Sequence, residues 1–207
     1  MTIREPAEYY FSLWSYGLER KGGLRCMIEK LDPRLTSRMY GSLSRESFAW
    51  FLDYVLHSPV RYPSVGRYDW LPMCCDMYTT RALSMMVPIA SRLDFIEALR
   101  ADFSPPSFVR ASRPFWPEVL LRTSTLNSDF YVLVAAGALD FLDLKSDWKS
   151  HFSLHAEPLN SSLLSAGAGL YSDDYWTDNW LDCVREQTVL PLTLFEQASR
   201  VITDSQR

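Results

Sequence analysis

The 207-residue sequence predicts an all-α fold of about nine to eleven helices. Apolar residues recur at helical spacing along most of the chain, and no segment alternates apolar and polar residues between hairpin turns. Hydrophobic residues make up 47% of the chain and aromatic residues 14%, which is enough to bury a substantial core. We expect one compact domain over residues 1–207. Four prolines make residues 104–117 the candidate hinge between two lobes, residues 1–103 and 118–207.

Proline, glycine and capping residues divide the first half of the chain into helices. Pro6 suits the first turn of a helix that ends before Gly22, and Ser44 suits the cap of a later helix. Asp69 is the expected cap of a long apolar helix that ends near Pro88. The apolar positions expected from spacing are Tyr10, Trp14, Leu18, Leu24, Met27, Ile28, Leu31, Leu35, Met39, Phe48, Phe51, Leu52, Val55, Trp70, Cys74, Met77, Tyr78, Met85, Met86, Leu93, Ile96 and Leu99.

In the second half, residues 128–144 are apolar nearly all round, which predicts a helix buried on most sides. Pro158 and Asn160 open a further helix, and Pro191 starts the last one. A helix from Tyr171 to Glu186 lies between them. Trp176, Trp180 and Val184 lie four residues apart on one side of this helix, and this spacing predicts that the side docks on a core.

The helix expected from Tyr171 to Glu186 carries a stripe of acids that packing does not explain. Trp176 and Trp180 lie on the opposite side, where they can dock on a core. Like charges four residues apart weaken a helix, and only acids of the first turn gain from the helix dipole. Ser172 or Asp173 is the expected cap, so the later acids are either solvated or bind a partner. The candidate partner-binding residues are Tyr171, Asp174, Tyr175, Asp178, Asp182 and Glu186.

The charge of the chain is spread unevenly. Residues 1–122 hold 16 Lys and Arg against 13 Asp and Glu, a net charge of +3. Residues 123–207 hold 5 against 12, a net charge of −7. An acidic half attracts a basic protein and repels nucleic acid and an anionic membrane. We therefore expect a basic protein as the partner, and neither nucleic acid nor a membrane.

Cysteine usage and the N-terminus indicate a cytoplasmic protein. The four cysteines form no CxxC pair, and the first residues, MTIREPAEYY, lack the basic-then-apolar pattern of a signal peptide. Reduced, mostly buried thiols are the expectation. The longest uncharged apolar run, Phe130 to Leu139, is too short to span a bilayer.

Motifs that fix a catalytic activity are absent. The chain has no GxSxG nucleophile elbow, no HExxH zinc motif and no Walker sequence. His151 and His155 have the spacing of a metal pair, but no third ligand beyond Glu157 is evident. Cys183 lies near Trp180 on the docking side and is expected to be a structural thiol. No catalytic residue, metal or cofactor is therefore expected.

An enzyme that uses paired aspartates is the alternative. Asp140, Asp143 and Asp147 share a helix face, and with Asp174 and its neighbours they could hold Mg²⁺ between facing carboxylates. All-α hydrolases and prenyl-chain enzymes use such a device. No second acidic motif follows, however, and Lys or Arg that would bind phosphate are scarce nearby.

A non-catalytic binding protein fits the sequence best. A compact, acidic, cytoplasmic all-α domain without catalytic motifs has the profile of a stoichiometric inhibitor, such as a bacterial immunity protein that neutralises a toxin. Small adaptors and effector chaperones share this profile. A helical ligand-sensing domain is a further alternative, because the Met- and Trp-rich first half could supply an apolar cavity.

Overall fold

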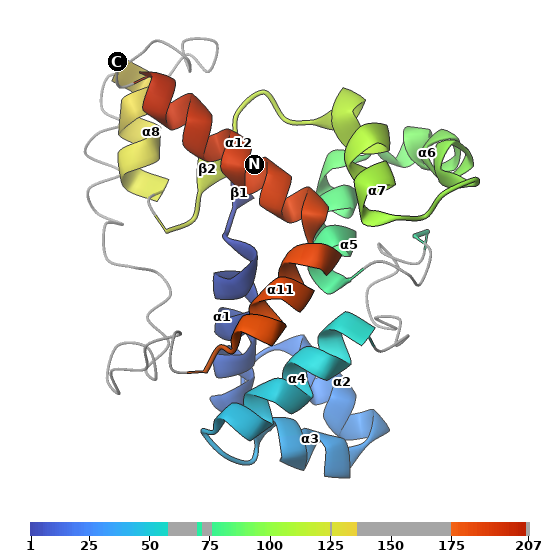
Figure 1. The fold of residues 1–207 in the computed structure, drawn as a ribbon, viewed down its shortest axis with the longest axis vertical. Helices are drawn as coiled ribbons and strands as arrows, with labels where there is room; N and C mark the ends of the chain where they lie inside the picture. Colours follow the sequence, from blue (N-terminus) through green and yellow to red (C-terminus); the bar gives the residue numbers. More distant parts are fainter. Residues whose placement is uncertain (58–69, 72–75, 125, 136–174, 206–207) are drawn as a thin grey trace.

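The all-α fold class predicted from the sequence is confirmed. The computed structural model describes residues 1–57, 70–71, 76–124, 126–135 and 175–205. Within these ranges the chain forms ten α-helices, two 3₁₀ helices and a sheet of two short strands. In Figure 1 the four N-terminal helices gather at one end of the molecule, and the long last helix crosses the other end.

The four N-terminal helices begin and end where capping residues place them. They are α1 (Pro6–Leu18), α2 (Gly23–Leu31), α3 (Pro33–Tyr40) and α4 (Arg45–His57). Gly22 has φ +86°, a conformation that suits glycine between two helices. Asp32 caps α3, and the Ser44 hydroxyl accepts a hydrogen bond from the Ser47 amide at the start of α4. Trp14 of α1 and Phe51 of α4 are fully buried, as their spacing predicts. Leu31, Met85 and Leu93 belong to the predicted apolar stripes but are exposed.

The next helix is shorter than the sequence predicts. α5 (Met77–Met86) is capped by Asp76, seven residues after the expected cap, and Trp70 and Leu71 precede it as a turn and a bend. Asp76 Oδ1 accepts the amides of Tyr78 and Thr79, so the helix begins where its first amides have a partner. The helix ends before Pro88, as predicted.

The proline-rich stretch at residues 104–117 folds as packed structure. It follows η1 (Ile89–Ser91) and α6 (Arg92–Leu99), and it contains α7 (Pro105–Ser112) and η2 (Arg113–Phe115). Phe108 is buried in the core, and Phe115 and Trp116 pack against it. Whether the two sides move as separate lobes stays a prediction.

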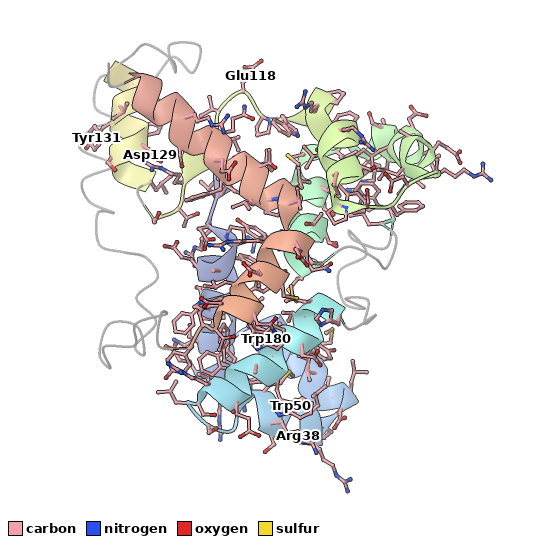
Figure 2. The ribbon with its side chains drawn as sticks, viewed as in Figure 1. Arg38, Trp50, Glu118, Asp129, Tyr131 and Trp180 are labelled. Atoms are coloured by element: carbon pink, nitrogen blue, oxygen red, sulfur yellow. The ribbon has the colours of Figure 1, made fainter. Side chains whose placement is uncertain are left out.

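Two strands that the sequence analysis does not foresee tie the N-terminus to the second half. β1 (Thr2–Ile3) pairs in parallel with β2 (Leu121–Arg122), a contact too short to leave an alternating pattern. α8 (Leu126–Ala135) follows, and Arg122 Nη2 donates to Asp129 Oδ1 at 2.6 Å. Asp129, labelled in Figure 2, is 99% buried by this pairing. The rest of the helix expected over 128–144 lies outside the described residues.

The last two helices connect the parts of the fold. α11 (Asp178–Gln187) packs on α1 and α4, and α12 (Val189–Ser205) packs on α5, α7, α8 and both strands. Leu194 and Ala198 of α12 are fully buried. None of the helices in the described ranges has the length and apolar character that a membrane span needs.

Candidate functional site

The acidic helix starts later than expected, and this places Asp178 in its first turn. α11 begins at Asp178, and the Thr177 hydroxyl oxygen accepts the Trp180 amide as the cap. The caps expected at Ser172 or Asp173 are therefore wrong for this helix. Asp178 lies in the first turn, where the helix dipole favours an acid. Repulsion along the stripe is thus smaller than the sequence suggests.

Tyr175 does not face the acidic side, which corrects its predicted role. It packs against Phe11 and Trp14 of α1, with ring centroids 5.5 Å and 5.3 Å apart. Trp176 stands edge-on to Phe48 of α4 at 4.9 Å. These two aromatic side chains precede α11 and fix it over the junction of α1 and α4. Tyr171 and Asp174 lie outside the described residues.

The other predicted acids are on the surface. Asp178, Asp182 and Glu186 are all exposed, on the side of α11 opposite the buried Val184. Asp182 pairs with Arg185 at 3.3 Å, and both side chains are more than half exposed. An exposed pair of this kind contributes little to stability. These three acids therefore stay available to a partner.

The facing helix α4 adds a fourth acid and a histidine that the sequence analysis does not single out. His57 Nδ1 lies 3.2 Å from Asp53 Oδ1, and His57 Nε2 lies 3.7 Å from Cys183 Sγ of α11. Burial is the first cause that raises the pKa of the Cys183 thiol, followed by the charges of Glu186 and Asp53. Carboxylates from both helices therefore lie close to one thiol.

Cys183, His57 and Asp53 stand in the order of a nucleophile, a base and an orienting acid. Catalysis by cysteine needs a thiolate at neutral pH, which a lowered pKa provides. Here the pKa of the thiol is raised instead. The raised pKa therefore favours the protonated thiol, and the structural role expected for Cys183 stays a prediction.

A shallow pocket opens beside these residues, between α3 and α4. It has a volume of about 270 Å³ and is lined by Leu35, Trp50, Asp53, Tyr54 and His57. Trp50 is 37% exposed. The guanidinium of Arg38 lies 4.8 Å from the centre of its ring, and Figure 2 shows the two side chains together at this end of the fold. The pocket thus combines aromatic walls with a carboxylate at its edge.

We call this region the α4–α11 surface, defined by Asp53, Asp178, Asp182 and Glu186 together with the pocket. Sequence reasoning finds the acids of α11 and misses the contribution of α4. A usable signal is present: Trp50, Asp53, Tyr54 and His57 recur at i, i+3, i+4 and i+7. This places two aromatic residues on the face of α4 opposite its core positions.

The metal-dependent alternative finds no support in the part of the chain that the structure describes. No group of three or more His, Cys, Asp or Glu side chains is arranged there to hold a metal ion. Asp140, Asp143, Asp147 and both His151 and His155 lie outside the described residues. The facing aspartates therefore stay a prediction.

Comparison with known proteins finds no relative of this chain. The chain matches no protein-family model, no curated protein and no solved structure. Any functional conclusion therefore depends on the geometry and charge of the chain itself.

Proposed function

We propose that the protein is a non-catalytic binding protein that recognises a basic protein partner through the α4–α11 surface. The observation that carries this proposal is the aromatic pocket with Asp53 at its edge, flanked by the exposed acids of α11. Aromatic side chains in a pocket are typical anchors of protein interfaces, and surrounding charges select the partner.

The chemistry of the pocket suits a lysine or arginine side chain. The methylene groups of such a side chain can lie against Tyr54 and the part of Trp50 that Arg38 leaves uncovered, while its charge meets the carboxylate of Asp53. Asp182 and Glu186 extend the negative potential along α11, in the half of the chain whose net charge is −7. A partner with a basic protruding surface is complementary to both features.

A partner that is neutralised by one-to-one binding fits this surface. The proposed class is a stoichiometric inhibitor, as in bacterial immunity proteins that block a basic toxin or effector, and the proposed location is the cytoplasm. An inhibitor of this kind needs a rigid complementary face and no catalytic group. The position of α11, held by the aromatic packing of Tyr175 and Trp176, supplies such rigidity.

The experiment compares proteins captured from the source cell by the wild type, by Trp50→Ala and by Tyr131→Ala. Tyr131 is the matched control, because it is 39% exposed against 37% for Trp50 and lies on α8 at the other end of Figure 2. We expect a basic protein that the wild type and Tyr131→Ala retain and that Trp50→Ala loses. Truncation of an anchor residue weakens binding by about 2 kcal/mol or more.

Circular dichroism of each variant establishes that it is folded before capture. A partner lost equally by Trp50→Ala and Tyr131→Ala, or retained by both, contradicts the assignment of this surface. A partner that is acidic contradicts the proposed charge complementarity.

A further inference from the structure

A second hollow lies between the N-terminal segment, α1 and α5. It shares no lining residue with the pocket of the α4–α11 surface. Its volume of about 370 Å³ falls within the range of small-molecule sites, which is roughly 300–1,000 Å³. The side chains that line it include two arginines, Arg4 and Arg81.

The backbone of Arg4 is fixed to α5 by a tyrosine. The Arg4 amide donates to the Tyr78 hydroxyl at 2.8 Å, and the same hydroxyl donates to the Arg4 carbonyl at 2.8 Å. The two residues are 74 positions apart in the chain, so this reciprocal pair joins the N-terminal segment to α5. Arg4 is thereby held at the mouth of the cavity.

Arg81 reaches the same cavity one helical turn after Tyr78. Its guanidinium carbon lies 6.0 Å from the ring centre of Tyr9 on α1. Tyr9 and Tyr78 are stacked, with ring centres 3.8 Å apart and planes 6° from parallel. One pair of stacked rings therefore holds the backbone of Arg4 through Tyr78 and lies beside the guanidinium of Arg81 through Tyr9.

The remaining lining is a mixture of hydroxyl and apolar groups. Ser12 and Thr123 contribute hydroxyls, and Leu13 and Met85 contribute apolar surface. The charged side chains among the described residues that line the cavity are the two arginines. Burial raises the pKa of Tyr78, so its phenol stays neutral at physiological pH and adds no negative charge.

We propose that this cavity binds a small organic anion, with its phosphate or carboxylate group on Arg4 and Arg81 and its apolar body against Leu13 and Met85. Guanidinium groups match the planar geometry of oxyanions and form charge-assisted hydrogen bonds with them. Hydroxyls beside the arginines supply further donors, and the apolar walls favour a ligand with a hydrocarbon part. This site is independent of the protein-binding function proposed above.

The probes are phenyl phosphate, benzoate, inorganic phosphate and the neutral benzyl alcohol, titrated calorimetrically into the full chain at constant ionic strength. We expect saturable binding of at least one aromatic anion and none of benzyl alcohol. The comparison of phenyl phosphate with benzoate identifies the anionic group. The comparison of phenyl phosphate with inorganic phosphate measures the contribution of the apolar walls.

Arg81→Gln and Arg4→Gln should each weaken binding about tenfold, the effect of losing one charge-assisted hydrogen bond. Arg113→Gln is the matched control, because Arg113 also lies 6.0 Å from an aromatic ring, that of Trp116, and lines neither hollow. It should bind as the wild type does.

A readout on the wild type keeps the proposal testable if a variant fails to fold. The bound anion should shift the side-chain Nε–H nuclear magnetic resonance signals of Arg4 and Arg81 and leave that of Arg113 unchanged. Absence of saturable binding by any of the anions, equal binding of benzyl alcohol, or unchanged binding in folded Arg4→Gln and Arg81→Gln would overturn the proposal.

Discussion

At the scale of single residues, the contact of Cys183 with His57 bears on whether this cysteine is a nucleophile or a structural thiol. Its sulfur lies 3.7 Å from His57 Nε2, and the other ring nitrogen of His57 lies 3.2 Å from Asp53. If Nδ1–H donates to Asp53, then Nε2 is the acceptor for the thiol, which favours the neutral S–H form. Glu186 and Asp53 act in the same direction, because negative charges nearby disfavour a thiolate. A raised pKa leaves less thiolate at neutral pH and so makes Cys183 a weaker nucleophile there.

The reactivity of Cys183 towards iodoacetamide tests this assignment. A raised pKa means a smaller thiolate fraction at pH 7, so we expect alkylation to be slow there and to accelerate at higher pH. Glu186→Gln removes a negative charge near the thiol, which lowers its pKa and should speed the reaction at pH 7. The exposed Glu196 on α12 provides the control, and Glu196→Gln should react as the wild type does.

Peptide mass spectrometry assigns the label to Cys183 separately from the exposed Cys26 and the other cysteines. Fast alkylation of Cys183 at pH 7, unaffected by Glu186→Gln, is the result that would restore the nucleophile reading. A raised pKa that Glu186→Gln lowers supports the structural one.

At the scale of single elements, the start of α5 depends on a contact from far along the chain. Asp76 Oδ1 accepts the amides of Tyr78 and Thr79, the second and third residues of the helix, and also the hydroxyl of Tyr10 at 2.6 Å. Tyr10 is fully buried on α1, 66 residues away. Burial raises the pKa of Asp76, and hydrogen bonds from Thr79 and Tyr10 oppose that rise. One carboxyl thus caps a helix and satisfies a core hydroxyl.

Replacing Asp76 by Ala and by Asn should separate these contributions. Asp76→Ala removes the cap and leaves the Tyr10 hydroxyl without its acceptor, so we expect the free energy of unfolding to fall by about 2–4 kcal/mol. Asp76→Asn keeps an acceptor for the same donors and should lose far less. Urea unfolding at pH 7 measures both changes.

The pH dependence of the free energy of unfolding, compared between the wild type and Asp76→Asn, tests the effect of the Asp76 charge. The folded pKa of Asp76 lies above its usual range, so ionisation costs stability as the pH rises through that interval. Asp76→Asn lacks this contribution, and its advantage over Asp76→Ala should persist at pH 7. An Asn variant as unstable as the Ala variant would show that the carboxylate itself is required.

The element boundaries show what the sequence can and cannot predict. Local signals suffice at Pro6 and Ser44, each of which precedes a clear apolar stripe. Both failures, at α5 and α11, occur where more than one capping residue is available: Asp69 or Asp76 before α5, and Ser172, Asp173 or Thr177 before α11. The structure chooses Asp76 because Tyr10 meets it, and Thr177 because the core takes Tyr175 and Trp176. Such choices depend on distant contacts that periodicity does not contain.

For the whole molecule, charge is predictable from the sequence and shape is not. The acidic second half follows from counting residues, and Asp182 and Glu186 are exposed as their helical phase predicts. The place of Asp53 beside the acids of α11 depends on how α4 packs against α11, and the pocket depends on how α3 packs against α4; no local pattern specifies either. The two hollows lie in regions of opposite charge, since Asp53 lines one and Arg4 and Arg81 line the other.

The last prediction concerns the association of the whole surface with its partner. The charge-reversed variant is Asp182→Lys with Glu186→Lys. Asp178 is left intact, because an acid in the first turn of α11 stabilises the helix. A lysine at position 186 lies in the last turn, where its positive charge interacts favourably with the helix dipole. Loss of the exposed pair of Asp182 with Arg185 should cost little stability. The variant should therefore fold with nearly unchanged stability.

Its association with the purified partner should slow by about tenfold or more at low salt, because complementary charges act mainly on the encounter rate. At 0.5 M salt the rates of wild type and variant should converge, since screening shortens the reach of the charges to a few ångströms. Stopped-flow fluorescence measures both rates, and Glu196→Lys with Glu97→Lys reverses two exposed acids of α12 and α6 as the control. An equal slowing in this control would assign the effect to net charge. An unchanged rate in the α11 variant would make its acids an ordinary solvated face and place the partner elsewhere.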